Sequence, residues 1–230
     1  MPITRHTRPI SLALAGFVAL AALGLGACEG GTSTPSLSDT SYWRGQFAKG
    51  QGVEVVVAKG RAAVPLLTSL LGDSNEFVVQ TAAMAAQQIG EPAADTVSVL
   101  LTALGRFPKQ PYVIAAIKAM QGAAVPHLVP YVKSSDRRQQ EIGIELLNNI
   151  GNDAEPALDA LVEIAEDASA SMSLRRKALV TIGSIGTPAE RMVQRINEIA
   201  KSVDELRNDA ATANKRIRTE QKVIKKGGDR

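Results

Sequence analysis

Residues 60–67, GRAAVPLL, return in shortened form as GAAVPHL at residues 122–128. An Ile-Gly pair recurs through the same part of the chain, at residues 89–90, 150–151 and 185–186, with Gln121-Gly122 in the corresponding place. The glycines at 90, 122, 151 and 186 therefore stand 32, 29 and 35 residues apart. Self-similarity at a period of about 30 residues indicates a protein built from repeated supersecondary units.

Each repeat is predicted to contain two amphipathic helices separated by a polar break. In the first helices, apolar residues recur at helical spacing, as in Val64, Leu67, Leu70 and Leu71 and again in Leu158, Leu161, Val162 and Ala165. The second helices share this pattern, in Ala82, Ala85, Ala86 and Ile89, in Ile142, Leu146, Leu147 and Ile150, and in Leu174, Ala178, Leu179, Ile182 and Ile185. Prolines fall early in the first helices, where a missing N–H is tolerated, at Pro65, Pro126 and Pro156. Glycines fit left-handed caps at the ends of second helices, at Gly90, Gly122 and Gly151.

Helical hairpins of about 30 residues are too small to bury their own apolar faces, and they gain a core by stacking on one another. The arrangement resembles HEAT repeats, in particular the short bacterial type that also occurs in phycobilisome lyase subunits. The repeat that ends at Gly186 matches that pattern well, with Leu174-Arg175, Ala178, Ile182 and Ile185-Gly186 in the family's positions. We therefore expect an all-α fold, an α-solenoid of about four HEAT-like hairpins over residues 42–202, followed by a long C-terminal helix. Such arrays serve many unrelated partners, so the resemblance informs the fold and not the function.

The segment before the first complete repeat is predicted to be a half-repeat that enters the stack. Its sequence, QGVEVVVAK at residues 51–59, contains three consecutive valines, and a β-strand is the alternative. Tyr42, Trp43 and Phe47 precede it as an aromatic cluster in a chain with only 3% aromatic residues. We expect the cluster to cover the first repeat, with a ligand-binding or membrane-interface role as the alternative.

The N-terminus has the features of an export signal. Arg5 and Arg8 precede 16 apolar or small residues, 10–25, a run shorter than the roughly 20 residues of a spanning helix. Leu25-Gly26-Ala27-Cys28 follows and resembles the lipobox of bacterial lipoproteins. By that resemblance, residues 1–27 are a lipoprotein signal peptide, and Cys28, the only cysteine, carries a covalent lipid after cleavage. The alternatives are an ordinary signal peptide with an incidental cysteine and a cysteine used for metal binding or catalysis.

Residues 28–41 are polar and contain two glycines and a proline, a composition that predicts a flexible tether between a bilayer and the folded part. Glu29, and not an aspartate, follows the cysteine. By resemblance to enteric lipoproteins, this favours the outer membrane over the inner membrane in a cell that has both. We therefore expect a lipid-anchored protein of the bacterial cell envelope.

The charge of the chain is unevenly distributed. The formal net charge is +3, and residues 44–202 hold 16 Lys and Arg against 16 Asp and Glu. Residues 215–230 hold seven basic residues against Glu220 and Asp229. An exported protein rarely meets nucleic acid, so we expect no nucleic-acid partner. The basic end instead favours anionic lipid head groups or an acidic envelope polymer as its target.

The C-terminal region is predicted to be one continuous helix. Residues 187–190, TPAE, combine a capping box with a proline at the first helical position, and no Pro or Gly follows until Gly227. Apolar residues then follow at a 4-3 spacing, at Met192, Ile196, Ile199, Val203, Leu206, Ala210, Ala213, Ile217 and Ile224. A helix from residue 188 to about 226 would be roughly 57 Å long, and its residues 203–230 would form a basic extension beyond the stack. Ile217 and Ile224 would then pair with another helix, in a weak homo-oligomer or a partner; the alternative is a second half that frays or lies on a surface.

No catalytic or metal-binding set can be assembled from the sequence. After cleavage His127 is the only histidine, for which a surface or cap role is expected, and no Ser-His-Asp set, Cys-His pair or two-histidine metal site is available. Carboxylates cluster in two groups, Asp153, Glu155 and Asp159, then Glu163, Glu166 and Asp167. Paired acids could support glycoside cleavage, but these alternate with apolar positions on one helix and favour a solvated face. We expect no enzyme, no metal and no cofactor other than the lipid on Cys28.

Basic residues begin two of the second helices, at Arg137 and Arg138 and at Arg175, Arg176 and Lys177. A structural role, in pairs with Asp136 or Asp167, competes with a patch for an anionic partner. The function that we predict is a non-enzymatic, lipid-anchored scaffold or adaptor that binds an unidentified envelope protein through its inner helices. Its candidate partner-binding residues are Arg137, Arg138, Arg175, Arg176, Lys177, Ile217 and Ile224. The alternative is an accessory subunit of a covalent-attachment enzyme of the lyase type, or of an envelope-modifying enzyme.

Overall fold

The computed structural model describes residues 35–108 and 110–227, with side chains described as far as residue 219. These residues form α-helices and short 3-10 helices, and no strand occurs among them. The α-helices are α1 (Thr40–Phe47), α2 (Val53–Val57), α3 (Val64–Leu71), α4 (Glu76–Ile89), α5 (Val97–Arg106), α6 (Pro111–Ala119), α7 (Val125–Val132), α8 (Arg137–Ile150), α9 (Leu158–Glu166), α10 (Met172–Ile185), α11 (Val193–Ser202) and α12 (Arg207–Gly227). The 3-10 helices are η1 (Gly60–Ala63), η2 (Glu91–Thr96), η3 (Gln121–Ala124), η4 (Gly151–Ala157), η5 (Thr187–Met192) and η6 (Asp204–Leu206). Cys28, the predicted signal peptide and the start of the predicted tether lie outside the described residues.

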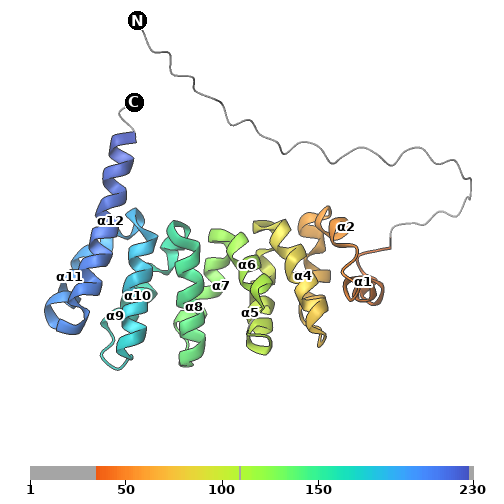
Figure 1. Ribbon diagram of the computed structural model, residues 1–230, viewed down its shortest axis with the longest axis horizontal. Coiled ribbons are helices and arrows are strands. Elements are labelled where there is room, and N and C mark those ends of the chain that lie inside the picture. The colour runs from red at the N-terminus through yellow and green to blue at the C-terminus, as the bar shows by residue number, and fades with distance from the viewer. Residues whose placement is uncertain (1–34, 109, 228–230) are drawn as a thin grey trace, which may run out of the picture. The chain divides into compact units, whose positions relative to one another are not determined.

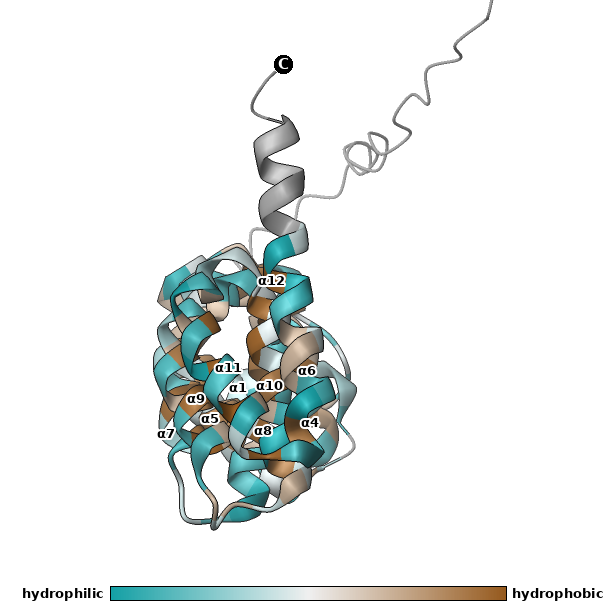
Figure 2. Cartoon of the chain, turned by 90° about the vertical axis from the view of Figure 1, so that its left-hand side faces the viewer, coloured by the Kyte–Doolittle hydropathy of each residue, from teal (hydrophilic) through white to brown (hydrophobic). Residues whose placement is uncertain are grey.

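From α3 onward the helices pair into five consecutive hairpins that stack in two layers. The second helices, α4, α6, α8, α10 and α12, pack side by side in chain order (Figure 1). The first helices, α3, α5, α7, α9 and α11, form the other layer, and the hydrophobic residues lie on the inner sides of both (Figure 2). The predicted all-α solenoid is therefore confirmed, with five hairpins where about four were expected.

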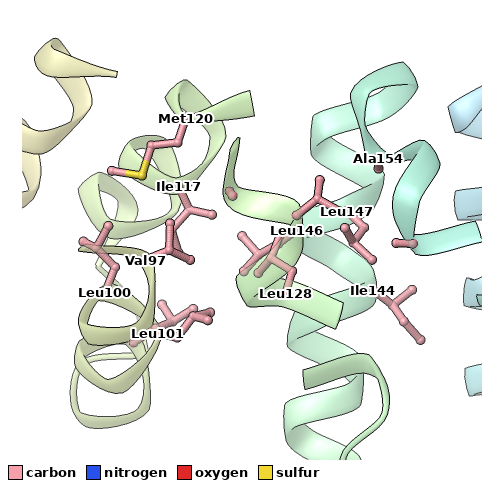
Figure 3. Packing of buried hydrophobic residues seen from close by; sticks show 14 of the residues in the cluster. Val97, Leu100, Leu101, Ile117, Met120, Leu128, Ile144, Leu146, Leu147 and Ala154 are labelled. Carbon is pink, nitrogen blue, oxygen red and sulfur yellow. The ribbon is translucent and has the colours of Figure 1, made fainter. Parts of the chain in front are cut away.

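The core lies between the two layers and is built from the apolar faces that the periodicity predicts. Each hairpin contributes aliphatic side chains from both of its helices, because neither helix can bury its stripe alone. Figure 3 shows this packing in two successive hairpins, with Leu100 of α5 and Ile117 of α6 in one and Leu128 of α7 and Leu147 of α8 in the next, all fully buried. Aliphatic packing of this kind continues from one hairpin to the next without interruption.

The recurring glycines make the junctions between hairpins. Gly90, Gly151 and Gly186 have φ of 71°, 73° and 69° with ψ of −138°, −130° and −134°. These angles belong to the first central position of a type II′ turn, and glycine adopts them without steric cost. They are not the left-handed helical angles predicted for Gly90 and Gly151. Gly122 departs from the prediction, since the positive φ at its junction belongs to Gln121, at 47°.

The N-terminal segment forms a helical cover on the first hairpin. Residues 51–59 contain the helix α2 and no strand, so the helical prediction is confirmed. Trp43 and Phe47 of α1 are buried at 2% and 0% exposure, and the Thr81 hydroxyl of α4 donates to the Phe47 carbonyl. Trp43 and Phe47 thus cover the first repeat as expected, whereas Tyr42, the third residue of the cluster, is 39% exposed. Leu37 also packs against the core, so the folded part begins inside the segment predicted as tether.

The prediction of one continuous C-terminal helix is wrong. Helix α11 ends at Ser202, Val203 is extended with φ −134° and ψ 99°, and the chain turns through η6 into α12. Helix α12 packs against both α10 and α11 as the second helix of the fifth hairpin, at the end of the stack that faces the viewer in Figure 2. Its apolar stripe is buried there, at Leu206, Ala210, Ala213 and Ile217. A 4-3 spacing of apolar residues is the same in a straight helix and in two helices folded onto one core, so the pattern could not show the break.

Candidate binding surface

Two neighbouring grooves run along the layer of second helices, one on each side of α8. The groove between α6 and α8 is lined by Ile114, Arg138, Ile142, Glu145, Leu146 and Asn149, among others, and has a volume of about 200 Å³. The groove between α8 and α10 is lined by Ile144, Glu145, Asn148, Arg176, Lys177 and Val180, among others, and has a volume of about 410 Å³. Both have an apolar floor with a few polar groups at the edge, which is the usual composition of a binding site. Glu145 is shared by the two.

Arg175, one of the predicted partner-binding residues, is part of the interior. Its side chain is only 6% exposed, and its Nε donates to the Ala165 carbonyl at 2.9 Å. A guanidinium nitrogen also lies 3.9 Å from the Met172 sulfur. Arg175 therefore satisfies a carbonyl near the end of α9 within its own hairpin and is not available to a partner.

Arg176 and Lys177 link α10 to the helices on either side of it. Arg176 Nε lies 3.3 Å from a carboxylate oxygen of Asp209 on α12. Lys177 Nζ lies 3.7 Å from Glu141 on α8, which Arg137 also approaches at 3.3 Å. These basic residues pair with acids of neighbouring helices, and not with the turn acids that the sequence suggested.

The two turn acids are occupied by their own turns. Asp136 accepts the backbone N–H of Arg138 at 2.8 Å and so caps α8. Asp167 accepts hydrogen bonds from the Ser169 hydroxyl and the Ser169 N–H, and these bonds hold the pKa of its carboxyl below the ordinary value. Their role is therefore local, at the starts of the second helices.

Of the predicted basic residues on the surface, Arg138 is the one that makes no ion pair among the described residues. It is exposed, it lines the α6–α8 groove, and no carboxylate among the described residues lies within 4.0 Å of it. By contrast, Ile217 is fully buried against the stack and cannot bind a partner helix. The side chain of Ile224 lies outside the described part of α12, as does Cys28 outside the described chain.

Of the clustered carboxylates, the three on α9 lie in the layer of first helices and join successive hairpins. Asp159 of α9 pairs with Arg191 at 3.2 Å, and Glu166 pairs with Arg195 at 2.5 Å. That hydrogen bond raises the pKa of Arg195 above its ordinary value. Glu163 pairs with Lys133 at 3.3 Å. The acids of α9 are 40–58% exposed, in keeping with the solvated face expected for them.

His127 is half-buried, and its Nδ1 lies 3.3 Å from the Ser98 hydroxyl of α5, a contact that fits the surface or cap role expected for it. Within residues 35–108 and 110–227, no group of three or more His, Cys, Asp or Glu side chains is arranged to hold a metal ion.

The sequence did not single out Glu145, Asn148 or Val180. Val180 is 41% exposed although its neighbours in sequence, Leu179 and Thr181, are buried. A signal was present, because Arg176, Lys177 and Ser184 flank Val180 at helical spacing and place it on the polar face of α10. An apolar residue on a polar helix face indicates a binding site only when it lies beside a groove. The groove depends on the packing of two helices and cannot be read from the sequence of one.

No single α-helix of the described chain is both long enough and apolar enough to cross a bilayer. One pair of helices, Pro111–Ala119 and Gln121–Val132, meets that test of length and composition together, across a bend of 109°.

The chain matches no family model, and no curated protein matches it. The solved structures to which it is similar include an engineered protein and two designed armadillo repeat proteins. One is an engineered protein with 21% identity and a TM-score of 0.42, over 82% of this chain and 93% of that one. A designed armadillo repeat protein has 19% identity and a TM-score of 0.40, over 81% and 96%. A second one, in complex with the peptide (KR)4, has 17% identity and a TM-score of 0.39, over 79% and 91%. These identities and TM-scores are too low to support an argument. That the chain is a helical repeat protein follows from the order and packing of its own helices.

Proposed function

We propose that the chain is a non-enzymatic scaffold, lipid-anchored at Cys28 in a bacterial cell envelope, that binds a protein partner on its layer of second helices. The observation that carries the proposal is the pair of grooves flanking α8, each with an apolar floor and polar edges. Stacked second helices present one continuous surface, and such surfaces are what solenoids use to bind partners.

The distribution of acids and bases supports this choice of surface. In the layer of first helices, the carboxylates of α9 are taken up by Lys133, Arg191 and Arg195, so their role is to hold hairpins together. Beside α8, Arg138 and Glu145 line the grooves and make no ion pair among the described residues. Charged side chains without internal partners are the ones that can be used for recognition.

The binding surface can be tested by site-specific photo-crosslinking in intact cells. A photoreactive amino acid replaces Val180, beside the α8–α10 groove, and in a control it replaces Glu155, an exposed residue of η4. A discrete crosslinked product from position 180 and none from position 155 is expected. Products from 155 alone, or from neither position, would refute binding at the second helices.

The lipid anchor follows from the lipobox resemblance alone and is tested separately. Cys28→Ser should abolish labelling by an alkyne fatty acid, because the thiol is the acceptor of the thioether-linked lipid. Equal labelling of the variant and the wild type would refute the anchor and, with it, the proposed outer-membrane localisation.

A further inference from the structure

The ridge of α8 between the two grooves carries acceptors that the fold does not use. Glu145 is exposed and lines both grooves, and no cation among the described residues lies within 4.0 Å of its carboxylate. Glu141, one turn earlier, is instead approached by Arg137 and Lys177. The Asn148 side-chain oxygen is buried and receives no hydrogen bond from the described chain. The Asn148 oxygen is out of reach of a partner on the surface, but the Glu145 carboxylate is exposed and unpaired, so it favours a partner that brings a cationic donor.

The nearby cations do not cancel this requirement. Arg176 is paired with Asp209 and Lys177 with Glu141, so the cations of the α8–α10 groove are already engaged. Arg138 stands seven residues before Glu145 on α8, which is about 10 Å along the helix axis. Glu145 is therefore the unpaired charge over the middle of the ridge.

Hydrophobic surface lies on both sides of this charge. Ile114 and Leu146 line the groove between α6 and α8, and Val180, 41% exposed, lines the groove between α8 and α10. Axes of packed helices lie about 8–10 Å apart, and an extended chain in the polyproline II conformation advances about 3.1 Å per residue and turns the same face to a surface at every third residue. A segment that crosses α8 from one groove to the other therefore spans about three residues.

We propose that the grooves flanking α8 bind an extended segment of the protein partner that seats one apolar side chain in each groove and a lysine or arginine between them over Glu145. The occupant follows from charge complementarity, since a carboxylate at the middle position would be repelled by Glu145 and would leave it without a donor. This inference rests on the proposed function and specifies the chemistry of its partner.

The test uses labelled 12-residue peptides and the full chain purified in detergent, with fluorescence anisotropy as the readout. One peptide carries two leucines three residues apart with a lysine between them, in a Ser/Gly background, and the matched peptide has glutamate in place of the lysine. The lysine peptide should bind about five-fold more tightly at low salt, a typical effect of one exposed ion pair. Glu145→Lys should reverse this preference, and Val180→Asp should weaken both peptides.

The control variant is Glu155→Lys, which makes the same change of charge at an exposed carboxylate away from the grooves. It should leave the ratio of the two affinities unchanged, and circular dichroism should show wild-type helix content in all three variants. The inference would be overturned if neither peptide bound, or if Glu145→Lys left the ratio of the two affinities unchanged. It would also be overturned if Glu155→Lys changed that ratio as much as Glu145→Lys does. Photo-crosslinking from position 180 separates the two proposals: if the product persists while the charge reversal has no effect, the scaffold stands and the basic segment does not.

Discussion

Gly183 lies where α10 meets α12, and the absence of its side chain lets the two helices approach. A Cβ at this position would stand 2.9 Å from the Ala213 Cα, closer than real Cβ contacts, and 3.3 Å from the Arg216 side chain. Because the atom it meets is backbone, α12 as a whole would have to move. One small residue thus decides whether the fifth hairpin closes onto the fourth.

Gly183→Ala should therefore destabilise the protein by about 1–2 kcal/mol in urea unfolding, because overpacking outweighs the better helix propensity of alanine. The matched control is Gly105→Ala on α5, where an added Cβ meets nothing within 4 Å. That variant should be as stable as the wild type or up to about 1 kcal/mol more stable. Equal stabilisation by the two substitutions would contradict the close approach of α10 and α12.

Asp73 links the N-terminal cover to the first hairpin and should make stability depend on pH. The Arg44 guanidinium donates to its carboxylate, and the Asn75 N–H donates to it at 2.8 Å. The hydrogen bond from Arg44 is the main cause that holds the pKa of Asp73 below its ordinary value. A lowered pKa stabilises the folded state above the unfolded value of about 4, and this stabilisation is lost as the pH falls through the folded value.

Asp73→Asn should accordingly lower the melting temperature at pH 7, and the difference from the wild type should shrink as the pH is lowered below about 4. Arg44→Gln should lower it in the same direction, and the double variant should show little further loss. Melting curves between neutral and acidic pH measure this. A difference that stays constant down to the lowest pH would rule out ionisation of Asp73 as the cause.

At the scale of the element, α12 is an integral part of the stack and not a protruding extension. It packs on α10 and α11, and it buries Leu206, Ala210, Ala213 and Ile217 together with the element that precedes it. Each fully buried aliphatic side chain contributes about 1.5–3 kcal/mol. The heptad spacing suggested that this stripe is exposed and supports a weak association with another molecule. The stripe is instead buried within the stack and stabilises the fold.

Deletion of residues 207–230 should lower the free energy of unfolding by about 3–6 kcal/mol, because it exposes the face of α10 that α12 covers. Deletion of residues 220–230 alone, which removes most of the basic residues of the tail but leaves Ile217, should cost little. Chemical denaturation of both truncated proteins distinguishes these outcomes. If the protein lacking residues 207–230 were as stable as the one lacking residues 220–230, the packing of α12 on the stack would be contradicted.

At the scale of the whole molecule, the last hairpin differs from the internal ones where a further hairpin would stack. Val162 is the fifth residue of α9, and Asn197 is the fifth residue of α11. The series Leu174, Ala178, Ile182 and Ile185 of the fourth hairpin returns with the same spacing as Leu206, Ala210, Asn214 and Ile217. Two buried aliphatic residues are thus replaced by asparagines, and Asn214 Nδ2 donates to Asn197 Oδ1 at 2.8 Å. A polar outer face is what ends a stack and keeps it soluble.

The double substitution Asn197→Val and Asn214→Ile should restore the apolar face of an internal hairpin and promote end-to-end association of two copies. Light scattering at increasing protein concentration should show a rise in mean mass for the variant and a monomer for the wild type. Glu198→Gln, on the same helix, serves as the control and should stay monomeric. A monomeric double variant would show that these asparagines do not limit the stack.

Periodicity alone was enough to predict the helical hairpins, their stacking and the positions of most junctions, but not the backbone conformation of the junction glycines. The core residues of α9 and α10, Leu158, Leu161 and Ile182 among them, were readable because apolar spacing along a helix depends on local sequence. The burial of Trp43 and Phe47 agrees with the prediction for the aromatic cluster, but composition did not distinguish them from Tyr42 and Phe77, which are 39% and 46% exposed.

Only the tertiary structure decided the properties that depend on residues distant in sequence. The partners of Arg176 and Lys177, the break at Val203 that turns α12 back onto α10, and the grooves beside Glu145 each require the relative position of two hairpins. Spacing along one helix determines which face is apolar, but it does not determine which other helix covers that face. The physical reason is that a stripe of apolar residues lowers its free energy equally by packing on its own stack or on another molecule, and only the packed chain shows which of these occurs.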